Sequence, residues 1–385
     1  MRSSQSPDVV VIGGGIIGCS IALRLAQGKL KVTVVDRGEP GAEASSAAAG
    51  MLAPQGETVT PDAYFELARS SRDLYPSFVA EVEELSGKTV GYRRDGTLLV
   101  ARSDEEEREL DRVFSGQTAY GLPLERLTAE AARARVPTLA PDIRSALFIA
   151  GDHSVDNEKL LPALAEAARH AGVKFLSRAA VTRFQARSRA AGSASKGIES
   201  VELAHSAPGK GKTLSAGSYI LAAGCWSAEL AAPLGVRLPM PPCRGQMIEF
   251  ESGDEAPIPL VVRAGHHYLV PREGRRVLAG TTAEYAGFGK AVTGEGLASI
   301  LEGVRRLVPA VKHFRFRRAW AGLRPDTADH LPILGFGEIK NLIYATGHFR
   351  NGILLAPITA QVITELILTR STPLSIAAYG PARFC

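Results

Sequence analysis

The sequence contains few cysteines, and they form no recognisable metal-binding or disulfide pattern. Only Cys19, Cys225, Cys243 and Cys385 occur in 385 residues, and no two of them make a CxxC pair. Cysteines scattered in this way argue against a disulfide framework and against a zinc site, so we expect a reducing compartment and no bound metal.

The chain also lacks a long basic block. Its formal net charge is +5, and the densest basic stretch, residues 312–318, alternates like a strand. This pattern argues against a nucleic-acid partner. The small positive excess suits anionic small molecules better, such as a diphosphate or a carboxylate.

Long hydrophobic runs are missing as well. We identify no apolar segment of 18 residues, and the short run Val9–Ile12 is preceded by Asp8 and followed by three glycines, unlike a signal peptide. We therefore expect no membrane span and a cytoplasmic location.

The chain of 385 residues is longer than a domain with one ordinary hydrophobic core, which favours two domains or one core with a large insertion.

The first 36 residues predict a strand, a helix and a second strand. Residues Val9–Gly13 form a β-branched run, and Ile17, Ile21 and Leu25 then follow helical spacing. Residues Lys31–Asp36 form the second run. This order is typical of a βαβ unit with two parallel strands.

Further parallel α/β pieces are predicted near the middle and at the end, at Ser218–Gly224 and Asn341–Thr369. Between them, Gly91–Val100 with an Asp95–Gly96 hairpin and Met240–Thr282 favour antiparallel sheet. Helices are predicted at Tyr64–Ser86, Ser103–Tyr120, within 152–170 and at Glu295–Leu307, and a surface loop at Arg187–Gly197. The fold class is therefore α/β: a Rossmann-like nucleotide-binding domain (1–88, 150–224, 320–385) with an inserted antiparallel-sheet substrate domain (89–149, 225–319).

A G-x-G-x-x-G motif lies between the first strand and the first helix. Gly13 suits the tight turn, Gly15 lets the backbone approach a diphosphate, and Gly18 lets helix and strand pack closely. The helix N-terminus offers free N–H groups to the phosphates. Asp36, which ends the second strand, can accept hydrogen bonds from ribose hydroxyls. Together these features predict a bound dinucleotide.

Two features favour FAD over NAD. The motif lies at the extreme N-terminus, and the small-residue stretch Ser45–Met51 follows the second strand closely. Small side chains there would leave room for a bulky isoalloxazine ring.

The C-terminal third places two arginines in apolar, glycine-flanked settings. Arg324 precedes a proline, and Arg350 lies between Gly347 and Gly352. An arginine in such a place is either a structural ion pair or an anchor for a carboxylate, and sequence chemistry leaves both open. The first N–H groups of the last helix could stabilise negative charge on a reduced flavin.

Four segments together carry a family resemblance: VVVIGGGIIGCSIALRLAQ, ASSAAAGMLAP, WAGLRPDTADHLPILG and GHFRNGILLAP. Over about residues 8–369 the chain resembles the D-amino-acid oxidase family of flavoenzymes. Within that family it is most similar to the glycine oxidases that serve thiamine biosynthesis. The resemblance implies non-covalent FAD and oxidative deamination of glycine, sarcosine or small D-amino acids with O2. The products would be the 2-oxo acid, ammonia or an amine, and hydrogen peroxide. Family members are often tetramers, which makes a homo-oligomer an expectation here.

The resemblance also implies site residues. Arg324 falls on the carboxylate-binding arginine, Tyr268 on the substrate-site tyrosine and Arg350 on a second arginine near the substrate. The predicted cofactor-binding residues are Gly13, Gly15, Ile16, Ile17, Gly18, Asp36, Arg37, Ser45, Ser46, Ala48, Gly50, Met51, Val181, Gly224, His348, Arg350, Asn351, Gly352, Ile353 and Leu354. Asp36 stands where many members carry Glu, and Phe349 replaces a common Tyr. We interpret His348 as structural rather than catalytic.

Two alternatives remain at this stage. The first is a dehydrogenase of D-amino acids or N-methyl amino acids that passes electrons to a quinone. The second is a flavin-binding protein without turnover, against which the paired C-terminal arginines argue. The peroxide yield under air would distinguish an oxidase from a dehydrogenase.

Overall fold

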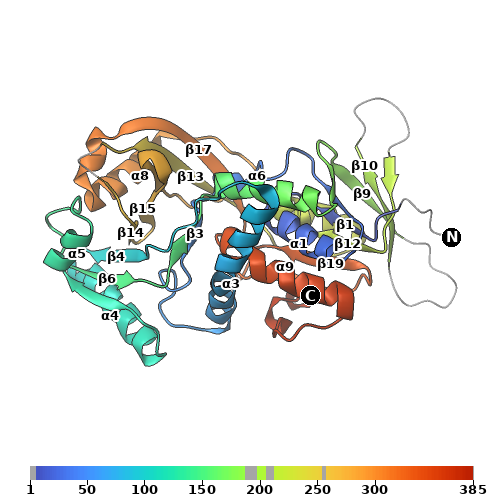
Figure 1. Cartoon of the computed structure of the whole chain (residues 1–385), viewed down its shortest axis with the longest axis horizontal. Coiled ribbons are helices and arrows are strands. Elements are labelled where there is room, and N and C mark those ends of the chain that lie inside the picture. The colour runs from blue at the N-terminus through green and yellow to red at the C-terminus, as the bar shows by residue number, and fades with distance from the viewer. Residues whose placement is uncertain (1–5, 187–196, 205–211, 254–256, 385) are drawn as a thin grey trace.

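Two β-sheets organise an elongated molecule, one toward each end of its long axis (Figure 1). The computed structural model describes residues 6–186, 197–204, 212–253 and 257–384. Of the loop predicted at Arg187–Gly197, residues 187–196 lie outside the described residues.

The first sheet has six strands in the order β18-β19-β12-β1-β2-β8. All neighbours are parallel except β18 and β19. The β-branched run of β1 is buried on both faces, which suits the centre of a parallel sheet. The strands are β1 (Val9–Ile12), β2 (Val32–Val35), β8 (Lys174–Leu176), β12 (Ser218–Leu221), β18 (Ile333–Phe336) and β19 (Leu342–Thr346).

Helices and a small sheet cover the two faces of this sheet. The helices α1 (Ile16–Gln27), α3 (Ala63–Ser86), α6 (Asn157–His170) and α9 (Gly352–Thr369) share one apolar core with it. A second core lies between the sheet and the antiparallel strands β9 (Val181–Ala186), β10 (Ile198–Leu203) and β11 (Lys212–Leu214). Burial on both faces explains why its strands are almost wholly apolar.

The second sheet has eight strands in the order β17-β13-β16-β15-β14-β4-β6-β5. One core packs it against α5 (Ala129–Arg135) and α8 (Gly294–Leu307), and another against α4 (Asp104–Ala119). The strands are β4 (Thr97–Ala101), β5 (Glu125–Thr128), β6 (Ser145–Ile149), β13 (Pro242–Glu251), β14 (Val261–Ala264), β15 (His267–Pro271), β16 (Arg276–Gly280) and β17 (Arg315–Pro325).

The structure confirms most of the predicted elements, including the opening βαβ unit, the four central helices and the final strand and helix. The Asp95–Gly96 hairpin was wrong. Gly96 has φ of +82° and packs against Phe148, while β4 pairs with β6 and with β14, both distant in sequence. Strand β17 runs unbroken through the predicted domain boundary at 319/320.

The expectation that no apolar segment reaches 18 residues was also wrong. Among the described residues, the helix α9 is long enough and apolar enough, by length and composition only, to cross a membrane. Its mean hydropathy is 1.7. Of its residues, 61% are buried, and α9 packs against α1 and α3. Its apolar composition is therefore accounted for by neighbours within the protein.

Candidate active site

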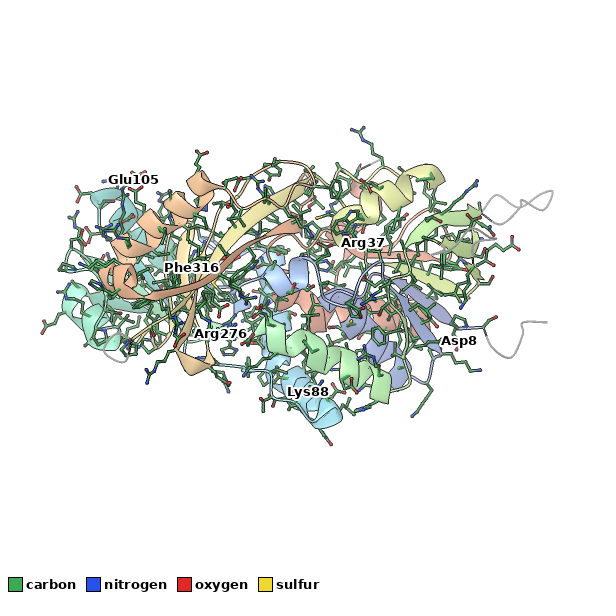
Figure 2. The ribbon with its side chains drawn as sticks, turned by 90° about the horizontal axis from the view of Figure 1, so that it is seen from above. Asp8, Arg37, Lys88, Glu105, Arg276 and Phe316 are labelled. Atoms are coloured by element: carbon green, nitrogen blue, oxygen red, sulfur yellow. The ribbon has the colours of Figure 1, made fainter. Side chains whose placement is uncertain are left out.

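A cavity of about 980 Å³ lies between the two sheets and takes its walls from both. The six-stranded sheet contributes the end of β1, the start of α1 and the turn before α9. The eight-stranded sheet contributes parts of β13, β15 and β17. Figure 2 shows Arg37, one of the lining residues, near the middle of the long axis, with Asp8 and Glu105 toward opposite ends.

The glycine loop forms one end of the cavity. Gly13 has φ of +106°, and a Cβ added there would lie 2.3 Å from the carbonyl oxygen of Ala222. A Cβ on Gly18 would lie 1.9 Å from the carbonyl oxygen of Gly13. A Cβ added at Gly15 would meet only the Ser45 hydroxyl within 4 Å, and Gly15 lines the cavity. The loop thus leaves backbone and a helix start, whose N-cap Gly15 has no side chain, facing an open space, as diphosphate binding requires.

Asp36 and Arg37 continue this wall from the end of β2. The Asp36 carboxylate accepts hydrogen bonds from the backbone N–H groups of Gly14 (2.6 Å) and Gly38 (2.7 Å), so it is fixed beside the glycine loop. The Arg37 guanidinium lies 3.4 Å from the centre of the Trp226 ring and pairs with Glu43. An acidic group for a ribose and a stacked cation are therefore present at the same end.

Hydrogen bonds hold the small-residue segment 44–51 against helices of the six-stranded sheet and against the eight-stranded sheet. The backbone N–H of Ile16 donates to the Ser45 hydroxyl at 3.0 Å, which joins this segment to the start of α1. Asn157 donates its side-chain amide to the carbonyls of Ser45 (2.9 Å) and Ser46 (3.0 Å). Arg272, which is almost fully buried, donates to the Ala49 carbonyl.

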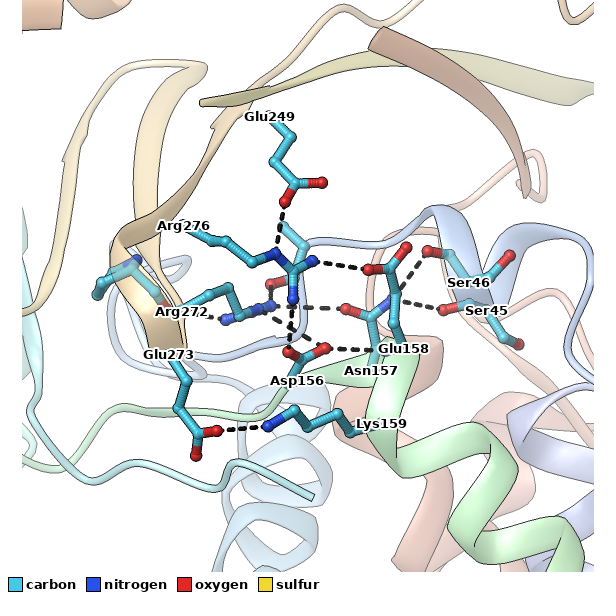
Figure 3. Close-up of polar contacts among 12 residues, drawn as sticks. Ser45, Ser46, Asp156, Asn157, Glu158, Lys159, Glu249, Arg272, Glu273 and Arg276 are labelled. Atoms are coloured by element: carbon cyan, nitrogen blue, oxygen red, sulfur yellow. Dashed lines mark hydrogen bonds and ion pairs between the residues drawn. The ribbon is translucent and has the colours of Figure 1, made fainter. Parts of the chain in front are cut away.

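Figure 3 shows that the contacts of Asn157 and Arg272 belong to a charged network between the start of α6 and residues of β13, β16 and the turn before β16. Arg276 pairs with Glu249 (2.5 Å), Glu158 (2.9 Å) and Asp156 (3.5 Å). The guanidinium partners hold the pKa of the Glu249 carboxyl below its usual value, although burial opposes this. Because the network joins residues at the start of α6 to residues of the eight-stranded sheet, it fixes the 44–51 segment in the wall of the cavity.

Arg324 occupies the other end of the cavity, on β17. Its guanidinium donates to the Thr282 carbonyl (3.0 Å) and to the Thr281 hydroxyl (2.8 Å). No carboxylate lies within ion-pair distance of it in the described part of the chain. A Cβ on Gly245 would lie 2.2 Å from this guanidinium, so the glycine on β13 is what gives Arg324 its space.

Tyr268 and the turn before α9 complete this end. The Tyr268 hydroxyl donates to the Met247 sulfur at 3.3 Å, and burial raises the pKa of Tyr268 above its ordinary value. Arg350 is more exposed and has Glu57 at 3.7 Å. The His348 ring nitrogen Nε2 lies 3.1 Å from the Thr359 hydroxyl, and burial lowers the pKa of His348 to about 3, so it is a neutral structural residue.

Most of the predicted site residues lie together around this one cavity. Those that line it are Gly13, Gly15, Ile16, Ile17, Asp36, Arg37, Ser45, Ala48, Gly50, Met51, Val181, Gly224, Tyr268, Arg324, His348, Arg350, Asn351, Gly352 and Ile353. Gly18 lies behind the loop, Ser46 faces a smaller adjoining hollow, and Leu354 is buried in the core. Roles for these residues remain predictions.

Sequence reasoning missed three side chains in the cavity wall. Trp226 lines the cavity and stacks against the Arg37 guanidinium. Glu57 and Arg263 were not considered, although both line the cavity and lie 3.7 Å apart. Glu57 lies three residues after the end of the AAAGMLAP motif, and that proximity was the one available signal.

The residues at hand fit FAD. At Gly15 the backbone borders open space that a side chain would enter, and the helix start carries no acidic residue in its first turn. Asp36 lies beside the glycine loop, where it is predicted to bind the ribose. The cavity is large enough for a dinucleotide together with a small substrate. Ile353 and Gly352 begin α9 at the far end, where backbone N–H groups can stabilise negative charge.

A buried carboxyl supports the loop that leads into the cavity. Asp152 accepts hydrogen bonds from the backbone N–H groups of Gly56 (2.9 Å) and Gln55 (3.3 Å). Burial raises the pKa of Asp152 to about 7. Because the folded protein holds this proton more tightly than the unfolded chain does, this group's contribution to stability is lost as the pH rises from about 4 to 7.

We therefore expect Asp152→Asn to remove that part of the pH dependence, since an amide does not titrate. Urea unfolding of both proteins across this pH range measures it. The free energy of unfolding of the wild type, minus that of the variant, should fall as the pH rises. Parallel curves would show that Asp152 does not hold a proton in the folded protein.

Comparison with known proteins gives a consistent result. The sequence model of the family described as FAD dependent oxidoreductase matches residues 8–366. Glycine oxidase of Geobacillus kaustophilus is 34% identical over 98% of this chain and 97% of its own. A crystal structure of glycine oxidase from Geobacillus kaustophilus superposes with a TM-score of 0.89 at 33% identity, covering 98% of this chain and 99% of the other.

The bifunctional protein ThiO/ThiG of Synechocystis is 37% identical over 98% of this chain. The present chain spans about half of that protein, 54% of its length.

Proposed function

This chain belongs to the D-amino-acid oxidase family of FAD-dependent oxidoreductases, and on that premise we propose that it oxidises glycine with molecular oxygen. The products are glyoxylate, ammonia and hydrogen peroxide, and sarcosine or small D-amino acids are further substrates. We propose that the FAD is bound non-covalently. When bound, the flavin supplies the acceptor for the two electrons that leave the substrate.

The observation that carries this proposal is the guanidinium of Arg324 inside the cavity. It is held by a carbonyl and a hydroxyl, both neutral, which leaves its charge available to an incoming carboxylate. Tyr268 adds a hydroxyl beside it, and Met247 and Ala49 add an apolar wall. The protein's contribution is to orient a small amino acid and to exclude water.

The direct test is anaerobic mixing of the FAD-loaded protein with glycine, sarcosine, D-alanine and D-proline while the flavin absorbance is recorded. We expect glycine to bleach the flavin, and air to restore the colour with one hydrogen peroxide formed for each glycine consumed. Bleaching without peroxide would indicate a dehydrogenase that uses another acceptor. A flavin that none of the four amino acids bleaches would refute the proposal.

We also propose that the reaction supplies the thiazole branch of thiamine biosynthesis in the cytoplasm, and that the chain forms a homo-oligomer. Similarity to ThiO/ThiG supports the pathway, and three buried free thiols support a reducing compartment. Light scattering on the purified protein would measure the oligomeric state.

A further inference from the structure

An amino acid carries a carboxylate and an amino group, and Arg324 can bind only the carboxylate. The carboxylate of the substrate has its partner there. The amino group, positively charged in the free amino acid, needs an acceptor in the same space, because a buried ammonium without one is costly. Six carboxylates line the cavity: Asp36, Glu43, Glu57, Glu229, Glu284 and Glu295.

Most of these carboxylates are occupied by the protein or exposed to solvent. Asp36 accepts two backbone N–H groups, and Glu43 pairs with Arg37 and Lys290. Glu284 accepts from Arg244, Gln246 and Thr282. Glu229 and Glu295 are exposed. Glu57 is the remaining candidate acceptor for the amino group of the substrate.

Glu57 is partly buried, and its carboxylate is incompletely satisfied. Its side chain is only 14% exposed, and its Oε2 atom has no hydrogen-bond partner although it is shielded from solvent. Arg350 lies 3.7 Å from Oε2, and Arg263 lies 3.7 Å from Oε1. Two cations at that distance balance the charge, but neither makes a hydrogen bond to Glu57. A buried acceptor of this kind normally has a donor.

Glu57 also lies close to the substrate end of the cavity. Glu57, Tyr268 and Arg324 line the same cavity, and Glu57 lies 3.7 Å from Arg350 of the turn before α9. The turn that carries Glu57 is fixed by Asp152, which binds the N–H groups of Gln55 and Gly56. Arg263 donates to the Gly56 carbonyl at 3.0 Å. The carboxylate is therefore presented by a braced turn.

We propose that Glu57 accepts a hydrogen bond from the amino group of the substrate while Arg324 holds its carboxylate. This inference rests on the proposed function, since it presumes an amino-acid substrate. It assigns to Glu57 the distinction between amino acids and carboxylic acids that lack the amino group. Both kinds of ligand meet Arg324, but only the first has a donor for the Glu57 carboxylate, which lines the same cavity.

The test compares Glu57→Gln with the wild type, using glycine and acetate as paired probes on the FAD-loaded protein. Anaerobic stopped-flow mixing gives the half-saturating glycine concentration from the flavin bleaching rate. Competition by acetate gives the acetate constant in the same experiment. We expect the glycine constant to rise about tenfold or more, as for loss of a charge-assisted hydrogen bond, and the acetate constant to change less than about twofold.

Two controls frame the result. Glu57→Asp keeps the charge and should recover part of the glycine affinity. Glu109→Gln removes an exposed carboxylate that pairs with Arg112 on α4, and should change neither constant. Equal shifts in the glycine and acetate constants would overturn the proposal, because Glu57 would then act only by positioning Arg350 or the cavity wall. An unchanged glycine constant would overturn it as well.

Failure of the proposed function looks different. There the wild-type flavin would not be bleached by any amino acid. If the wild type is bleached and Glu57→Gln behaves as the wild type does, only the role of Glu57 fails.

Discussion

Replacing Arg324 by alanine should weaken the binding of the substrate by at least about 3 kcal/mol, which is about 100-fold or more in the half-saturating glycine concentration. The substrate carboxylate would lose its partner inside a cavity whose neighbouring groups, the Thr281 hydroxyl and the Thr282 carbonyl, cannot replace a positive charge. Anaerobic flavin bleaching by glycine measures the effect directly. In contrast to Glu57→Gln, this variant should lose affinity for acetate as well.

A matched variant separates the charge from its geometry. Arg324→Lys keeps a cation but not the planar fork that binds two carboxylate oxygens, so we expect it to fall between the wild type and Arg324→Ala. The flavin content should stay normal in both variants, because Arg324 lies on β17 of the eight-stranded sheet, whereas the glycine loop follows β1 of the six-stranded sheet. Undiminished affinity for glycine in Arg324→Ala would show that the carboxylate is bound elsewhere.

Features written in local sequence could be predicted. The opening βαβ unit follows from a β-branched run, a glycine motif and helical spacing within 36 residues, and the structure has all three. Arg324 was identified from its glycine-flanked setting and the family resemblance. Its place in the cavity, however, depends on Gly245 of the neighbouring strand, nearly eighty positions earlier in the chain, which no local pattern connects with it.

The errors arose where distant segments decide the outcome. Asp95–Gly96 has the composition of a hairpin turn, but the strand after it, β4, pairs with β6 and β14. Both lie far from β4 along the chain, and this distant pairing overrides the turn signal. Helix α9 is apolar nearly all round because α1 and α3 cover it, which composition alone cannot distinguish from a membrane span. Glu57 is an ordinary loop glutamate in the sequence. Its proposed role follows only from the folded structure, in which Arg263 and Arg350 lie 3.7 Å from its carboxylate at the cavity wall.

The second large effect is expected from adding a single methyl group to the glycine loop. In Gly18→Ala the new Cβ would lie 1.9 Å from the carbonyl oxygen of Gly13, far inside the contact distance of real side chains. The obstructing atom is backbone in the tight turn between β1 and α1, so relief requires the helix to move away from the strand. Overpacking of this kind costs about 1–3 kcal/mol or more, and here the displacement falls on the phosphate-binding turn itself.

We therefore expect Gly18→Ala to be purified almost free of flavin and to bind added FAD at least about 100-fold more weakly than the wild type, which corresponds to a displacement cost of about 3 kcal/mol. Quenching of FAD fluorescence on titration measures the affinity, and far-ultraviolet circular dichroism shows whether the fold survives. Gly253→Ala is the matched control, since a Cβ at Gly253 meets nothing within 4 Å. A yellow Gly18→Ala protein with full flavin content would mean that helix and strand tolerate the wider spacing and that the close approach at Gly18 is not what aligns the turn with the diphosphate.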